Sequence, residues 1–146
     1  MGSGHQERTM DKKIETANLA KSLFIKGLDE LDKFEFRKAL DLFEKSLYLS
    51  PNRKTTLNNL AYCCIKLADL EQARFYIKRV LLIDQNDLTA HNHMASLYIS
   101  DANYEEALFL LDRIIIEDPS FLEARLNQID ALIGLKKYTS ALSACD

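Results

Sequence analysis

The sequence predicts an all-α fold built from pairs of antiparallel helices. Alanine recurs every 34 residues, at Ala39, Ala73, Ala107 and Ala141. The chain has only four glycines and two prolines in 146 residues, which favours long helices with short connections over a fold with many turns. A fixed period of this length is typical of repeat proteins, in which each repeat is one supersecondary unit.

The neighbours of the recurring alanines keep the same period. The residues three positions before them are all apolar: Phe36, Leu70, Tyr104 and Tyr138. Alanine allows two helix axes to approach to roughly 8 Å, and the bulky residue before it fills the adjacent layer. A second column of small residues, Gly27, Ala61 and Ala95, marks the other helix of each pair. Turn sequences at 50–52, 84–86 and 118–120 end the second helix of each pair.

This register resembles the tetratricopeptide repeat (TPR), a helix–turn–helix of 34 residues. The resemblance covers about residues 20–146, in repeats 20–53, 54–87 and 88–121 and a partial repeat 122–146. It implies a right-handed α-solenoid in which the first, or A, helices line a concave groove and the second, or B, helices form the outer wall. We expect the partial repeat to stop inside its B helix.

The N-terminus falls outside the repeat register. Residues 1–10, MGSGHQERTM, look like a cloning remnant and are expected to be disordered. The TPR domain is then 11–146, with its first helix beginning near Asp11.

Composition excludes several classes of partner. A net charge of −3 gives no basic surface for nucleic acid. No apolar run approaches the roughly 18 residues that a membrane span needs, so direct membrane insertion is not expected. The three cysteines, Cys63, Cys64 and Cys145, are odd in number and two are adjacent, which argues against a disulfide framework. We therefore expect the cytoplasm or another reducing compartment.

No catalytic motif occurs in the sequence. It lacks a phosphate loop, a dinucleotide-binding glycine turn and a nucleophile elbow, so we predict no enzyme activity and no cofactor. His91 and His93 are two positions apart on a helix and point in different directions, so we predict no metal site. Cys63 and Cys64 are expected to pack in the core as small apolar residues.

The predicted groove carries two columns of residues on the A helices. They are Phe24, Asn58, Asn92, Leu126 and Ile25, Asn59, His93, Asn127. A carboxamide offers a donor and an acceptor, which matches the N–H and C=O of an extended backbone. The pattern resembles the asparagine ladders of other TPR and armadillo-type peptide receptors. Two alternatives stay open: the asparagines are solvated polar residues, or they bond between neighbouring helices.

The sequence thus predicts a binding module that holds an extended peptide segment of another protein. Its groove residues are Phe24, Leu28, Asn58, Asn59, Tyr62, Asn92, His93 and Asn127. Tyr62 is either a ligand anchor or a packing residue. His93 is either a neutral substitute for asparagine or a group whose protonation near pH 6.5 changes binding.

One kind of partner is disfavoured by the groove sequence. TPR domains that grip the acidic C-terminal tails of heat-shock proteins use a clamp of Lys, Arg and Asn. Asn59 matches the asparagine of the second repeat. The cationic and remaining asparagine positions are instead occupied by Phe24, Leu28, Thr89 and His93.

The alternative function is structural assembly. Leu132, Leu135 and Leu142 have no following helix to cover them, although solenoids need a polar cap at each end. These residues would then stack on a second copy as a homo-oligomer, or on further repeats of the same chain.

Overall fold

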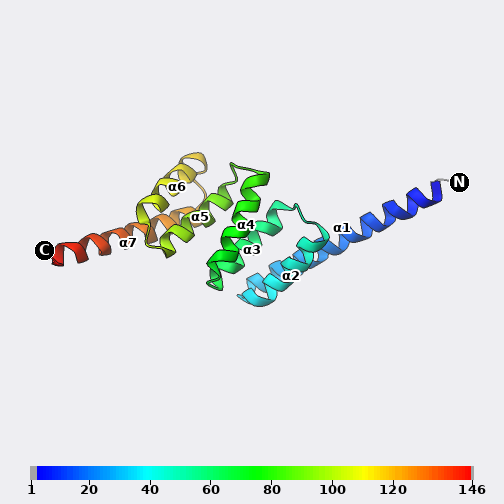
Figure 1. Ribbon diagram of the computed structural model, residues 1–146, viewed down its shortest axis with the longest axis horizontal. Helices are drawn as coiled ribbons and strands as arrows, with labels where there is room; N and C mark the ends of the chain where they lie inside the picture. The colour runs from blue at the N-terminus through cyan, green and yellow to red at the C-terminus, as the bar shows by residue number, and fades with distance from the viewer. Residues whose placement is uncertain (1–2, 146) are drawn as a thin grey trace. The chain divides into compact units, whose positions relative to one another are not determined.

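The computed structural model describes residues 3–145, except for the side chains of Ser140, Ala141, Ala144 and Cys145. All regular elements within this range are helices, as Figure 1 shows. They are α1 (Ser3–Asp32), α2 (Phe36–Leu49), α3 (Lys54–Lys66), α4 (Leu70–Ile83), α5 (Leu88–Ser100), α6 (Tyr104–Glu117) and α7 (Leu122–Cys145). The helices α2, α4 and α6 begin at the three apolar residues that precede the recurring alanines.

The chain divides into two compact units, Met1–Tyr76 and Ile77–Asp146, with the boundary inside α4. In the first unit, α2 packs against both α1 and α3. Phe43 of α2 is fully buried and lies against Gly27 of α1, where a Cβ atom would come within 2.5 Å of the ring. The Ser46 hydroxyl donates a hydrogen bond to the Ala20 carbonyl at 2.7 Å. Small residues on α1 therefore allow the close approach of α2 that the sequence predicts.

In the second unit, α6 packs against α5 and α7, and α7 also contacts α5. The core is formed by Ala95, Ala107, Leu111, Ile114, Ala124 and Ala131. Asp87 caps the N-terminus of α5, since its Oδ1 accepts a hydrogen bond from the Ala90 amide at 2.8 Å. Alanine from three helices thus forms much of this core, so the axes approach closely.

The turns between the A and B helices share one backbone conformation. Phe34, Ala68 and Ala102 have φ of 59°, 61° and 59°, in the left-handed region. The Ala68 amide donates to the Ile65 carbonyl at 3.1 Å, and the Asp69 amide donates to the Cys64 carbonyl at 2.9 Å. This pair of bonds is the Schellman motif, which satisfies carbonyls at the end of a helix. The 34-residue period therefore extends to the backbone angles.

The N-terminal end differs from the expectation of disorder over residues 1–10. Helix α1 begins at Ser3 rather than near Asp11, and residues 3–19 are exposed. This segment contains no proline and several good helix formers, which favours the extension of the helix. Residues 1–2 lie outside the described part of the chain, and the cloning origin of residues 1–10 stays a prediction.

The expectation of a separate B helix in the fourth repeat is wrong. Helix α7 continues from Leu122 to Cys145 without a turn. Before α4, the Asp69 side chain accepts a hydrogen bond from the Gln72 amide, whereas Lys137 holds the equivalent position in α7 and offers no acceptor. Leu135, Lys136 and Lys137 also favour helix, so nothing local ends it.

Candidate functional site

The two polar columns of the A helices are less exposed than a ligand-reading ladder requires. Asn58, Asn92 and His93 are buried, with exposed fractions of 9%, 5% and 7%. Of the five Asn and His residues in the columns, only Asn59 and Asn127 are half-buried and thus accessible from outside. Most of the predicted ladder therefore lies inside the repeats.

Asn92 and Asn127 are joined directly between α5 and α7. The Asn127 Nδ2 donates to the Asn92 Oδ1 at 2.9 Å and to the Ser96 Oγ at 3.0 Å. The Ser96 hydroxyl in turn donates to the Asn92 main-chain carbonyl at 3.3 Å. For this pair, the structure therefore supports the alternative in which the asparagines bond between neighbouring helices.

Ser96 is a member of this network that the sequence interpretation did not include. It follows Tyr62 by 34 residues and so occupies the same column as Leu28 and Tyr62. Extending that column by one repeat would have found it. A serine there gives no distinctive signal by itself, because hydroxyls are common on exposed helix faces.

Asn59 makes a bond within its own helix. Its Nδ2 donates to the Thr55 carbonyl at 2.9 Å, one turn earlier in α3. Such back-bonding is a common arrangement for short polar side chains inside helices. One of its amide hydrogens is therefore committed to the protein.

His93 is buried in α5, and burial lowers its pKa from 6.5 to about 4. The charge of Asp87 opposes this shift but does not cancel it. The histidine is therefore neutral between pH 5.5 and pH 7.5. The hypothesis that its protonation near pH 6.5 controls binding is wrong, because a buried imidazole loses the hydration that stabilises its charged form.

Phe24 and Leu28, the predicted apolar end of the groove, differ in their surroundings. Phe24 is half-buried, and its ring centroid lies 5.6 Å from that of Phe43. The Arg53 guanidinium carbon lies 5.1 Å from the Phe24 ring centroid. Leu28 is exposed. Phe24 is thus largely engaged by the protein itself, and Leu28 is the more accessible of the two.

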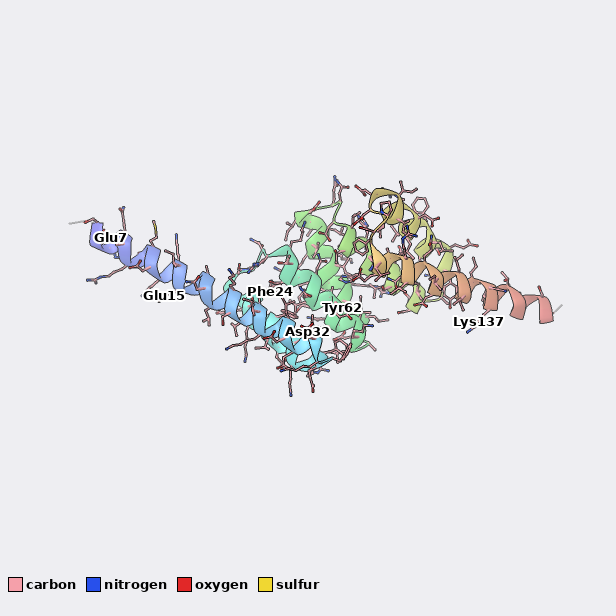
Figure 2. The ribbon with its side chains drawn as sticks, turned by 180° about the vertical axis from the view of Figure 1, so that it is seen from behind. Glu7, Glu15, Phe24, Asp32, Tyr62 and Lys137 are labelled. Atoms are coloured by element: carbon pink, nitrogen blue, oxygen red, sulfur yellow. The ribbon has the colours of Figure 1, made fainter. Side chains whose placement is uncertain are left out.

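Tyr62 of α3 takes part in aromatic contacts rather than standing alone. Its ring meets Phe36 edge-on at 6.1 Å, and the Lys66 Nζ lies 5.5 Å from its centroid. Figure 2 labels Tyr62 on α3 and Phe24 on α1. Packing and ligand contact are compatible here, because the ring is only half-buried.

The residues predicted for self-association lie on α7. Leu132 and Leu142 are each 52% exposed, and Leu135 is half-buried. Ile129 and Ile133 on the same helix are also exposed. Apolar side chains are thus exposed at several positions of α7.

Cys63 and Cys64 are buried, which confirms that they pack in the core. Burial raises the pKa of the Cys63 thiol to about 12 and that of Cys64 to about 11, so both thiols are protonated and unreactive at neutral pH. Among the described residues, no group of three or more His, Cys, Asp or Glu side chains could hold a metal ion. No helix in this part of the chain is long and apolar enough to cross a membrane.

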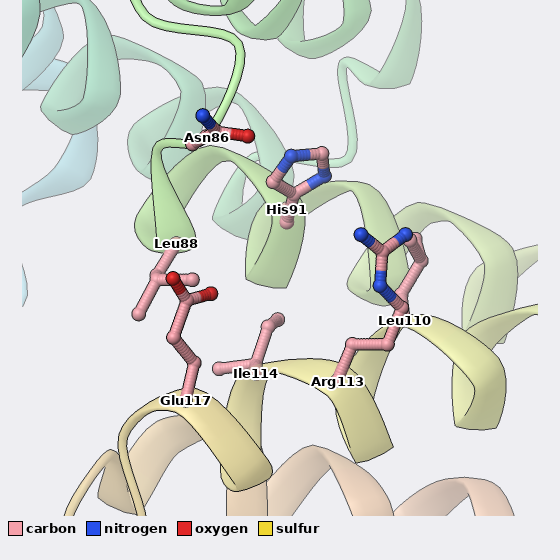
Figure 3. Close-up of a pocket in the computed structure, with 7 residues that line it drawn as sticks. All are labelled: Asn86, Leu88, His91, Leu110, Arg113, Ile114 and Glu117. Atoms are coloured by element: carbon pink, nitrogen blue, oxygen red, sulfur yellow. The ribbon is translucent and has the colours of Figure 1, made fainter.

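A small cavity lies between the start of α5 and the end of α6. Figure 3 shows its lining side chains, which include His91, Arg113 and Glu117. Its volume is about 40 Å³, close to the space of one water molecule. The His91 Nε2 lies 2.9 Å from the Gln85 carbonyl. The cavity is too small for an organic ligand.

Comparison with known proteins agrees with this geometry. Residues 30–97 match the family model described as tetratricopeptide repeat. The search of curated protein sequences gave no match to this chain.

Several solved structures share the fold. The first TPR domain of human RPAP3 is 17% identical with a TM-score of 0.72, over 85% of this chain and 98% of that one. The first TPR of Spaghetti (RPAP3), bound to HSP90 peptide SRMEEVD, is 18% identical with a TM-score of 0.69, over 82% and 95%. The TPR2B domain of yeast Sti1 in an Hsp70 complex is 19% identical with a TM-score of 0.66, over 77% and 95%.

The class of protein follows from these observations: the chain is an all-α solenoid of TPR helix pairs, as the sequence predicted. By sequence, residues 30–97 match the tetratricopeptide repeat model, and the described helices share the fold of solved TPR domains.

Proposed function

We propose that this chain is a protein-interaction adaptor that holds an extended segment of a partner along the face of its A helices. The observation that carries the proposal is the Asn127 side chain, which is half-buried and fixed by hydrogen bonds to Asn92 and Ser96. A side chain held in one rotamer loses little entropy when a ligand binds. Structures of the same fold with bound HSP90 and Hsp70 peptides support the idea that such a scaffold can hold a peptide.

The bonding pattern specifies the polarity of the contact. Both N–H groups of the Asn127 carboxamide are used inside the protein, so its Oδ1 is the atom left for a ligand. An oxygen acceptor pairs with a main-chain N–H of an extended segment. Asn92 is buried and serves to position Asn127 rather than to touch the ligand. Asn59 is the second accessible asparagine of the columns, and we assign it the same role.

The experiment uses peptides selected from a displayed library on the immobilised chain. We expect Asn127→Ala and Asn59→Ala each to weaken binding of such a peptide about tenfold, the value of one hydrogen bond of roughly 1 kcal/mol or slightly more. Asn103→Ala, at an exposed asparagine before α6, is the matched control and should leave affinity unchanged. Circular dichroism checks that helicity is retained.

Unchanged affinity in both groove variants, for a peptide that binds the chain, would reject the role of the polar columns. If Asn103→Ala lowers the affinity as much as the groove variants do, the effect of the groove variants is unspecific.

A second function is favoured by the exposed apolar side chains of α7. Here the chain assembles with a second copy, or with further repeats, through Leu132, Leu135 and Leu142. Sedimentation over a range of concentrations tests this proposal. A dimer that disappears in Leu132→Lys and persists in Phe109→Lys, at an exposed residue of α6, supports assembly through α7, and a monomer at all concentrations argues against self-association.

A further inference from the structure

The first unit has a shallow groove between α1 and the C-terminal half of α2. It consists of a hollow of about 460 Å³, with Leu23 and Tyr48 in its lining, and a hollow of about 360 Å³ that includes Ala17. Leu49 lines both hollows, so they are continuous, and we call them together the α1–α2 groove. The Tyr48 side chain is 85% exposed. The groove therefore offers apolar side chains that nothing in its own unit covers fully.

Helix α7, in the second unit, carries an exposed apolar stripe. Leu126, Ile129 and Ile133 are exposed and lie three and four positions apart, so they share one face of the helix. We call these three residues the α7 stripe. The core of the second unit uses another face of α7, through the buried Ala124 and Ala131. The α7 stripe is therefore left for a partner.

The charges beside the α7 stripe change sign along the helix. Glu123, Asp130 and Lys137 follow one another at seven-residue intervals, so they lie on one side of α7, next to the stripe. Arg125 and Lys136 border its other edge, and the Arg125 Nε donates to a main-chain carbonyl of the preceding turn at 2.7 Å. The first half of α7 thus has a net charge of −1 and the second half +2.

The α1–α2 groove has the opposite order of charges. Lys12 and Lys13 line the smaller hollow, which has no carboxylate in its lining. The charged residues that line the larger hollow are Asp41, Glu44 and Lys45. The lining is therefore +2 in the smaller hollow and −1 in the larger one.

Neighbouring charges of α1 do not belong to this lining. Asp11 and Glu15 lie next to the two lysines in the sequence, and Lys26 follows Leu23 by three positions. None of these three side chains lines either hollow. A ligand in the groove therefore meets the lysines at one end and mainly carboxylates at the other.

The spacing of the charges agrees between the two surfaces. Lys13 precedes Leu23, which lies in the hollow with the carboxylates, by ten residues, or about 15 Å along α1. On α7, Asp130 precedes Lys137 by seven residues and Glu123 precedes it by fourteen, or about 10 and 21 Å. If α7 lies parallel to α1, its acidic half therefore meets the lysines and its basic half meets the carboxylates.

We propose that the α1–α2 groove binds helix α7 of a second copy of this chain, parallel to α1. The α7 stripe packs on Leu23, Tyr48 and Leu49, and the complementary charges set the direction. Each copy contributes two different surfaces, so the contact is head-to-tail rather than two-fold. This inference rests on the second function proposed above, self-association through α7, and names the surface that α7 meets.

The test compares the full chain with two variants by sedimentation velocity. Tyr48→Lys changes only the groove and Ile129→Lys changes only the α7 stripe, both at exposed positions. We expect each variant alone to be monomeric at concentrations at which the wild type associates. An equimolar mixture should form a 1:1 dimer and nothing larger, because the intact stripe of one variant meets the intact groove of the other. Phe109→Lys, at an exposed residue of α6, is the matched control and should associate like the wild type.

Charge reversal tests the direction of α7 in the groove. Glu44→Lys and Lys137→Glu should each weaken association up to about fivefold, the range of an exposed ion pair. The two substitutions combined in one chain should restore it. In the antiparallel direction Lys137 would meet Lys12 and Lys13, so stronger association of Lys137→Glu would contradict the proposal.

The proposal is overturned if Tyr48→Lys associates like the wild type, or if the mixture of the two variants stays monomeric. A normal Tyr48→Lys with a monomeric Ile129→Lys would mean that two α7 helices meet each other, so the second function would stand without the groove. A wild type that is monomeric at all concentrations would reject both and would leave the peptide-binding function untouched.

Discussion

His93 illustrates how burial decides the role of a single residue. As a member of a groove column it looked accessible, but it is only 7% exposed and neutral at physiological pH. A buried neutral imidazole links stability to pH rather than ligand binding to pH.

The unfolded chain binds a proton on His93 near pH 6.5, whereas the folded chain binds it only near pH 4. The stability that this difference contributes is complete above pH 6.5 and is lost as pH falls from 6.5 towards 4. The total loss is roughly 3 kcal/mol at 1.36 kcal/mol per unit. Urea unfolding at about pH 7.5, 5.5 and 4.5 should show this loss, and His93→Gln should flatten it. Equal pH slopes for the wild type and His93→Gln, with His91→Gln as control, would contradict it.

Gly27 illustrates the cost of one methyl group at a helix contact. Its absent Cβ leaves room for the Phe43 ring, so alanine there forces the ring to move. We expect Gly27→Ala to lower the free energy of unfolding by about 1–3 kcal/mol, despite the better helix propensity of alanine. Gly4→Ala is the control, because no atom lies within 4 Å of its Cβ position. Thermal unfolding that shows both variants equally stable would mean that α1 and α2 are farther apart than described.

At the scale of the element, the turns between A and B helices depend on three non-glycine residues with positive φ. An L-residue in this conformation costs about 1 kcal/mol or more, and glycine does not carry that cost. At these three turn positions, the residue present therefore stabilises the fold less than glycine would.

We expect Ala68→Gly and Ala102→Gly each to raise the free energy of unfolding by up to about 1 kcal/mol. Ala17→Gly, in the exposed part of α1, should lower it by about 1 kcal/mol, because glycine inside a helix is unfavourable. Chemical denaturation of the three variants measures both signs. A decrease in all three would show that the turns are not left-handed in solution.

The contact between α5 and α7 depends on the two asparagines. Removing Asn127 leaves the Oδ1 of the buried Asn92 without this donor, which costs about 1–2 kcal/mol. In a double-mutant cycle, Asn92→Ala and Asn127→Ala should therefore couple by about 1 kcal/mol. If the effects of the two substitutions on the free energy of unfolding are additive, the two side chains do not interact, and Asn127 is a solvated polar residue.

At the scale of the whole molecule, the partner's chemistry is limited by the charges that the A helices carry. The positions that carry Lys or Arg in clamps for heat-shock tails are occupied by Phe24, Thr89 and His93, so we expect no such clamp here. The proposed ligand is thus an internal extended segment rather than an acidic C-terminal tail.

This leads to a direct measurement. The peptide SRMEEVD should bind the chain with a dissociation constant weaker than about 1 mM, because its carboxylates find no cationic clamp. The first TPR of Spaghetti (RPAP3), solved with this peptide, is the positive control. Micromolar binding of this peptide that is lost in Asn59→Ala would refute the prediction that the chain does not bind heat-shock tails.

The sequence by itself determined the first three helix pairs and the turns at 50–52, 84–86 and 118–120 that end them. These features depend on a 34-residue pattern of small and apolar residues, which local sequence carries completely. Tertiary structure decided which members of a column face outwards. Asn58, Asn92 and His93 have the same sequence signal as Asn59 and Asn127, but neighbouring helices bury them. Tertiary packing also joined Asn127 to Asn92 and Phe34 to Phe36 and Tyr62, because a one-dimensional pattern does not contain the distances between side chains.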